Sequence, residues 1–171
     1  MTESILTPAE AGRRLRADYD LLLGRVAGLT GEQLAARYQV AGGPLGDFCE
    51  SLHDLVAHVL MWDEISLAVL SEARAGRAHW SLDPRWETPD AGRRLNRGGV
   101  AAGREVPGDL LLHRLEAVAA AAAAEVGGCG EQAWAGIGPL AQRVWTVPGA
   151  PAFWHAGVHL GERLAGVAEL A

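Results

Sequence analysis

The chain has 171 residues, of which 49% are hydrophobic and 21% are charged, a balance typical of a folded globular protein. It contains 31 Ala and only 3 Ile, which favours helix over a large sheet, and all 15 basic residues are Arg. Without Lys it can form neither a Schiff base nor a phosphate-loop nucleotide site, and a net charge of −6 argues against nucleic acid as a partner.

The first predicted helix covers residues 8–28. Thr7 is placed to cap it, proline occupies its first position, and Glu10 completes a capping box. A second, short helix is expected over residues 30–37, and the glycine- and proline-rich residues 41–46 should end it.

The clearest predicted helix covers residues 51–75, which contain no Gly or Pro. Ser51 and Asp54 form a second capping box at its start. One apolar stripe then follows at steps of three or four residues: Leu55, Val59, Trp62, Ile65 and Val69. Residues 77–98 contain two Trp and two Pro, and we expect a long ordered loop there.

The second half of the chain continues the helical pattern. A third long helix is expected over residues 107–126, after a turn at 99–104. Residues 131–150 contain three Gly and two Pro and should form a loop with a short helical turn. A last helix is expected over residues 151–170. Four long helices predict an all-α four-helix bundle in which residues 1–171 form a single domain.

The two cysteines and the N-terminus indicate the cellular compartment in which the protein is expected. Cys49 and Cys129 form no C-x-x-C pair, so we expect reduced thiols in a cytoplasmic protein. The N-terminus has no apolar stretch of signal-peptide length, and the alanine run 119–124 is far too short to cross a membrane. No membrane partner is therefore expected.

Three of the six histidines form the candidate site. His155 and His159 lie four residues apart on the last predicted helix, which places both imidazoles on one face. His58 interrupts the apolar stripe of the 51–75 helix, and a buried imidazole needs a polar partner. We predict a divalent metal ion held by His58, His155 and His159, with positions left open for water or substrate. Zinc or nickel is expected, although imidazole also suits copper and iron.

The other histidines and acids have weaker claims to a site. His53 should face solvent, and His79 and His113 are pocket acids or bases only if the fold brings them to the site. Asp54 is explained by capping. The remaining acids are interpreted as follows: Asp63 and Glu64 as a solvated edge of their helix, and Glu162 either as a partner of a metal-bound His or as a surface acid.

The region 77–98 leaves two further alternatives open. Trp80 and Trp86 either cover an apolar pocket or only fix the loop. Its arginines either hold an acidic group of a cofactor or are solvated loop charges: Arg93, Arg94 and Arg97.

Two segments of the sequence resemble a known superfamily. Asp54-Leu55-Val56-Ala57-His58, followed four residues later by Trp62, matches a "D-L-x-A-H-x-x-x-W" helix, and His155 and His159 match an H-x-x-x-H pair near the C-terminus. In both respects the chain is similar to the DinB/YfiT-like four-helix bundle superfamily. The resemblance implies that fold, and it implies that the three histidines are the metal ligands.

The resemblance also implies two kinds of activity. One branch contains metal-dependent enzymes that use mycothiol or bacillithiol, so the chain would be a thiol-dependent transferase or isomerase acting on a small electrophile. The ClbS/DfsB group suggests instead a self-resistance protein that sequesters or hydrolyses a reactive small molecule. A third alternative is a structural bundle, without metal, whose partner is a second copy of the chain.

Overall fold

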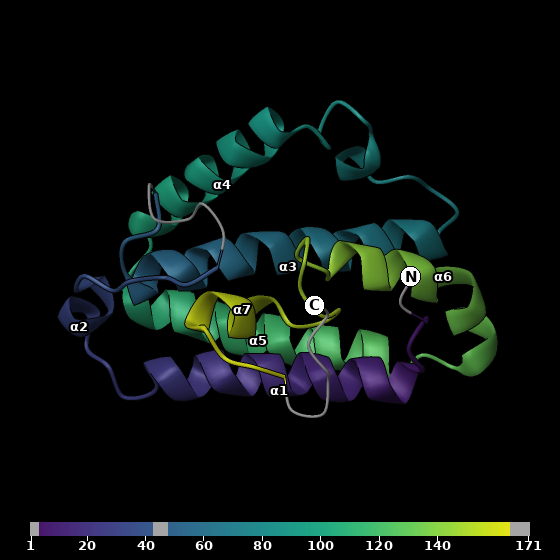
Figure 1. Ribbon diagram of the computed structural model, residues 1–171, viewed down its shortest axis with the longest axis horizontal. Helices are drawn as coiled ribbons and strands as arrows, with labels where there is room; N and C mark the ends of the chain where they lie inside the picture. Colours follow the sequence, from purple (N-terminus) through teal and green to yellow (C-terminus); the bar gives the residue numbers. More distant parts are fainter. Residues whose placement is uncertain (1–3, 43–47, 165–171) are drawn as a thin grey trace.

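The computed structural model describes residues 4–42 and 48–164. Within these ranges the regular structure is entirely helical, so the all-α prediction is confirmed (Figure 1). The elements in chain order are α1 (Pro8–Val26), α2 (Gly31–Ala35), α3 (Leu52–Arg74), the 3-10 helix η2 (Trp80–Leu82), α4 (Pro89–Arg104), α5 (Gly108–Gly127), α6 (Glu131–Val144) and α7 (His155–Leu160).

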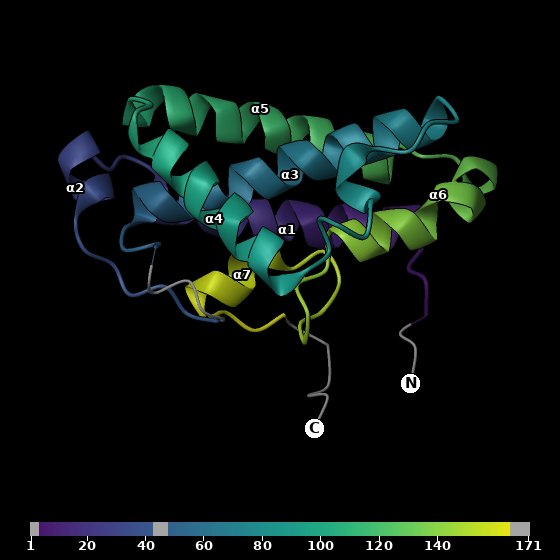
Figure 2. The same ribbon diagram turned by 90° about the horizontal axis from the view of Figure 1, so that it is seen from above.

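Three long helices form the body of the protein. In Figures 1 and 2, α1, α3 and α5 lie side by side, and α5 packs against both of the others. The remaining edge, between α1 and α3, is shared by α6 and the short α7, each of which contacts both helices. The chain is not helical between Val144 and His155, so α7 is a separate short helix that lies against α1 and α3.

One buried core joins these helices. Its members recur at steps of three or four residues, as the faces of packed helices require. On α1 and α5 they are Leu15, Tyr19, Leu22 and Val26, and Leu111, Leu115, Val118, Ala122 and Val126.

Thr7 and Ser51 are confirmed as N-caps, but the predicted capping boxes are incomplete, because Glu10 pairs with Arg13 and Arg14 and Asp54 with Arg104 and the amide of Glu50. Thr7 accepts a hydrogen bond from the backbone amide of Glu10, and Ser51 accepts one from that of Asp54. At α2, Thr30 and Gln33 form a complete capping box. These motifs are local, so their geometry follows directly from the sequence.

The predicted loop is confirmed over residues 77–88, where a 3-10 turn is the one regular element, and is wrong over 89–98. Helix α4 begins at Pro89 with Thr88 as its cap, and it also replaces the turn predicted at 99–104. The glycines of α4 allow it to approach α3. A Cβ on Gly103 would lie 2.3 Å from the Cβ of Ala57. Packing therefore outweighs low helix propensity here.

The prediction of a loop over residues 131–150 is also wrong. The 14-residue helix α6 occupies most of it, and Pro139 lies inside that helix. Trp134, Gly138 and Ala141 are buried on one face, and the indole of Trp134 donates to the Leu6 carbonyl at 2.7 Å. This packing stabilises a helix that Gly and Pro would otherwise weaken.

The last helix is shorter than predicted. It begins at His155, four residues after the expected start, and ends at Leu160, where Gly161 adopts a left-handed conformation with φ of +74°. The helix was expected to continue to residue 170, but residues 161–164 are not helical. Residues from 165 onwards lie outside the described part of the chain.

No helix in the described part of the chain is long and apolar enough to cross a membrane.

The expected partners need correction. Among the described residues, few large apolar side chains remain exposed: Ile5, Trp80, Trp86 and Leu110. The structure shows neither a second copy of the chain nor a small electrophile as a partner, and both expectations are withdrawn.

Candidate metal centre

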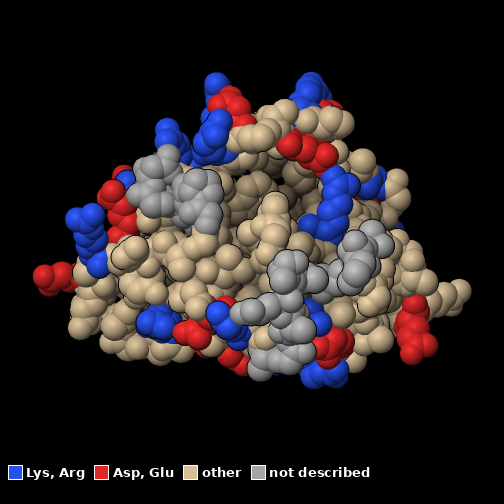
Figure 3. All heavy atoms as spheres, viewed as in Figure 1, with Lys and Arg blue, Asp and Glu red and all other residues tan. Residues whose placement is uncertain are grey.

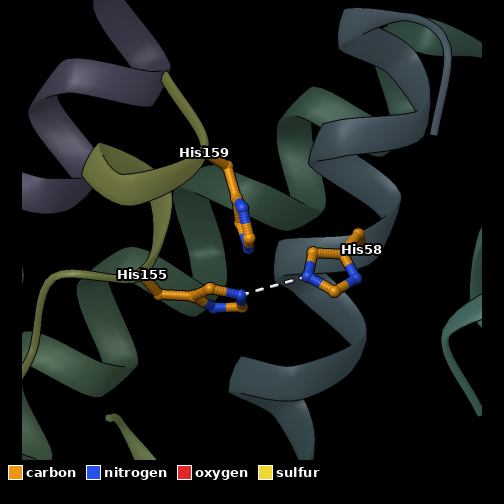
Figure 4. A group of neighbouring side chains, drawn as sticks. All are labelled: His58, His155 and His159. Carbon is orange, nitrogen blue, oxygen red and sulfur yellow. Dashed lines mark hydrogen bonds between the residues drawn. The ribbon is translucent and has the colours of Figure 1, made fainter. Parts of the chain in front are cut away.

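The three predicted histidines lie together in the fold. His58 comes from α3, and His155 and His159 come from successive turns of α7 (Figure 4). The three ring centroids are each 5.1 Å from the other two, with interplanar angles of 72°, 72° and 67°. One nitrogen from each ring lies within 4.8 Å of the other two. The imidazoles thus form a triangle around a common centre that could hold a metal ion.

The ring nitrogens are arranged so that the inward ones can bind metal. The Nδ1 atom of His159 lies 3.2 and 3.1 Å from the carbonyl oxygens of Ala41 and Gly42, which it can reach only as a donor, so its Nε2 keeps a free lone pair. The Nδ1 of His155 lies 3.7 Å from an Asp63 oxygen, and its Nε2 lies 3.2 Å from Nε2 of His58. This is the tautomer pattern seen in metal-bound histidines.

His58 is the least satisfied of the three. Its exposed fraction is 4%, and its Nδ1 has no hydrogen-bond partner among the described residues. Its Nε2 atom faces Nε2 of His155 at 3.2 Å (Figure 4). This imidazole can therefore serve as a metal ligand through Nε2.

The electrostatics favour neutral imidazoles. Burial, with smaller contributions from His155 and His159, holds the pKa of His58 well below its usual value. Burial also lowers the pKa of His159 to about 4, against the opposing effect of the carbonyls of Ala41 and Gly42. Metal ions bind neutral imidazole, so both side chains are in the binding form at neutral pH.

A buried carboxylate on α1 positions α7. Asp18 accepts hydrogen bonds from the backbone amides of His155, Ala156 and Gly157 at 3.1, 2.9 and 2.7 Å. Burial raises its pKa to about 6, although the amides of Gly157 and Ala156 oppose that shift. Asp18 therefore acts as the cap of α7, and its distance in sequence explains why local patterns did not reveal it.

The prediction that Asp63 is solvated is wrong. Its exposed fraction is 2%, and the hydroxyl of Tyr19 donates to it at 2.7 Å. Burial raises the pKa of Tyr19, so this hydroxyl stays protonated and donates. A signal was present, because Asp63 lies seven residues after Val56 and seven before Leu70, on one buried face. Its neighbour Glu64 does lie at the surface, paired with Arg114.

The histidine cluster opens into a cavity of about 500 Å³, which all three imidazoles line. Figure 3 shows the molecule hollowed beneath α4 and the segment before it. Trp62 of α3, Trp86 and Trp145 also line this cavity. Trp86 packs edge-on against Trp80, with ring centroids 4.9 Å apart, so the interpretation of Trp86 as a pocket residue is supported.

The other candidate histidines do not join the cluster. His53 was expected to face solvent, but it is half-buried, with Nε2 3.1 Å from the carbonyl oxygen of Val106. His79 contacts Ser81 at 2.8 Å, and His113 is exposed on α5.

The remaining charged candidates are engaged elsewhere. Glu162 lies 3.6 Å from Arg25 at the surface, as a surface acid would. Asp54 binds Arg104 through both oxygens and accepts from the amide of Glu50, so its side chain does not play the predicted part in a capping box with Ser51. On α4, Arg93 and Arg94 are exposed and lie near the Asp90 carboxylate.

Comparison of the chain with known protein families, curated proteins and solved structures finds no match. Function must therefore be inferred from the geometry of this centre. Membership of the DinB/YfiT-like superfamily stays a prediction.

Proposed function

We propose that the protein is a metal-dependent enzyme that activates a low-molecular-weight thiol for transfer or isomerisation, with a bundle of the DinB/YfiT-like type. The observation that carries the proposal is the triangle of three buried imidazoles that opens into a cavity. Three neutral nitrogen ligands leave coordination positions free, which is typical of catalytic rather than structural metal sites.

Each residue of the centre has a defined role in the proposal. His58, His155 and His159 would hold the ion, and a bound divalent ion lowers the pKa of a thiol or water at its open position. Asp63, 3.7 Å from Nδ1 of His155, would orient that ring once a metal is bound, and Asp18 fixes the helix that carries two of the ligands.

The resemblance to the superfamily adds the finer expectations. It implies zinc or nickel as the ion and mycothiol or bacillithiol as the thiol. A cytoplasmic location is part of the same proposal.

One observation favours the second candidate function, a self-resistance protein that sequesters or hydrolyses a reactive compound. Trp62, Trp86 and Trp145 line a cavity large enough for a drug-sized molecule. In that case binding would persist without metal.

A conjugation assay tests the enzymatic proposal. Zinc- or nickel-loaded, untagged protein would be given mycothiol or bacillithiol with the chromogenic acceptor 1-chloro-2,4-dinitrobenzene. We expect a rate above background in the parent and in His113→Ala, whose histidine is exposed and remote, and no such rate in His58→Ala. Equal rates in the parent and His58→Ala would contradict the proposal.

A further inference from the structure

The wall of the cavity is dominated by apolar groups. Three indoles line it, and Trp62 lies one turn after His58 on the same face of α3. Aliphatic side chains also line the cavity: Ile65, Val69, Leu82, Val144, Val147 and Pro148. A molecule that enters this space leaves water for an apolar surface.

The polar side chains of the same wall are already engaged with the protein. Ser66 donates to the Val144 carbonyl at 3.1 Å, and Ser81 contacts Nδ1 of His79 at 2.8 Å. Asn96 accepts from the indole of Trp62 at 2.6 Å, and Thr146 donates to the Gln142 carbonyl. A ligand rich in hydroxyl groups would have to break such bonds or lose its own hydrogen bonds to water.

The two charged side chains of the wall neutralise each other. Arg143 of α6 forms an ion pair with Glu87, from the segment between η2 and α4, and both are partly exposed at the rim. The buried end of the cavity is formed by His58, His155 and His159, whose exposed fractions are 4%, 8% and 4%. The strongest attraction for a negative charge would therefore come from an ion at the histidines.

We propose that the cavity takes a ligand with a flat aromatic body and a single anionic donor atom, an aromatic thiolate being the simplest case. This inference rests on the proposed metal function. The donor atom binds at the histidine centre, and the ring lies among Trp62, Trp86 and Trp145.

Two thiols of similar acidity separate the contribution of the aromatic ring to the binding affinity from that of the sulfur atom. Phenylmethanethiol carries a ring, and 2-mercaptoethanol carries a hydroxyl group in its place. Isothermal titration calorimetry on the zinc-loaded, untagged protein would measure both affinities, with zinc content checked after each titration. We expect phenylmethanethiol to bind more tightly by roughly tenfold or more.

A matched pair of tryptophan variants locates the binding site. Trp86 and Trp80 are neighbours with exposed fractions of 41% and 46%, but only Trp86 of the two lines the cavity. Trp86→Ala should weaken phenylmethanethiol binding by roughly threefold or more, without changing zinc content or the affinity for 2-mercaptoethanol. Trp80→Ala should have a smaller effect.

The possible failures are distinguishable. Equal affinities of zinc-loaded parent protein for the two thiols, or equal effects of the two tryptophan variants, would overturn this inference and leave the metal function standing. A parent protein that binds no zinc would overturn the proposed function and this inference with it.

Discussion

The carboxylate of Asp18 accepts a hydrogen bond from the backbone amide of His155, a residue 137 positions later in the chain. The next two amides, of Ala156 and Gly157, bind the same carboxylate. A side chain of the first helix thus fixes the start of the helix that carries two of the three histidines. The fold supplies a cap that the local sequence before α7 lacks, since Trp154 provides no side-chain hydrogen bond.

Replacing Asp18 with Ala should destabilise both the protein and the metal centre. Loss of an acceptor for three buried amides should lower the free energy of unfolding by about 2 kcal/mol or more. Metal affinity should fall by roughly tenfold, because His155 and His159 lose their fixed orientation. Urea unfolding and titration with a competing chelator measure the two effects. Asp20→Ala, at an exposed position of α1, is the control, and equal effects of both variants would contradict the capping role.

Asp63 should matter to the metal centre through His155. Asp63→Asn keeps the size of the side chain but removes the charge beside Nδ1, so metal affinity should fall by roughly tenfold. Glu64→Gln, at the adjacent exposed position, should leave the affinity unchanged. Tyr19→Phe removes the donor to Asp63 and should cost about 1–2 kcal/mol of stability. If the Asn variant bound metal like the parent, Asp63 would have no role at the centre.

The histidine triangle could be predicted because each part of it has a local signal. The spacing of His155 and His159 and the interruption of an apolar stripe by His58 are visible within single helices. Asp18 has no such signal, because its partners are backbone amides far along the chain. Asp63 has a local signal in its seven-residue spacing from Val56 and Leu70, but the adjacent Glu64 favours a solvated edge, and the Tyr19 partner that buries Asp63 comes from another helix.

The same distinction holds for the helices: those with a signal in their own sequence could be predicted, and those that depend on tertiary packing could not. The helices α1, α3 and α5 are long and contain few Gly or Pro residues in their interiors. By contrast, α4 and α6 contain residues that lower helix propensity and form because tertiary packing compensates. Gly103 illustrates this, since it allows a contact with Ala57 that single-sequence propensity cannot register.

Gly103→Ala should therefore destabilise the protein even though Ala is the better helix former. The added methyl group would collide with Ala57 and should lower the free energy of unfolding by about 1–3 kcal/mol. Gly98→Ala is the matched control on the same helix, because nothing lies within 4 Å of its added Cβ. That variant should be neutral or up to about 1 kcal/mol more stable. Similar urea midpoints for the two variants would show that α4 does not approach α3 closely.

Acid should destabilise the metal-free protein through the histidine cluster. The pKa of His159 is about 4 in the folded protein and 6.5 ordinarily, so below pH 6.5 the unfolded chain takes up a proton that the folded one does not. The stabilising contribution of neutral His159 is therefore complete above pH 6.5 and declines as the pH falls toward 4. His58 acts in the same direction, whereas Asp18, whose pKa is raised to about 6, acts in the opposite one.

A difference measurement separates these contributions. Free energies of unfolding of the parent and of His159→Gln would be compared from pH 4 to 7, so that the effect of Asp18 is common to both. The parent should lose on the order of 2–3 kcal/mol relative to the variant over this range. Parallel curves would mean that the pKa of His159 is not lowered by folding.

Metal content tests the central claim most directly. Untagged protein would be incubated with zinc or nickel, dialysed and analysed for bound metal, beside His58→Ala, His155→Ala, His159→Ala and the control His113→Ala. We predict about one ion per chain in the parent and in the control, and far less in each of the three cluster variants. A parent that binds no metal, or a control that loses as much as the cluster variants, would contradict a metal centre at His58, His155 and His159.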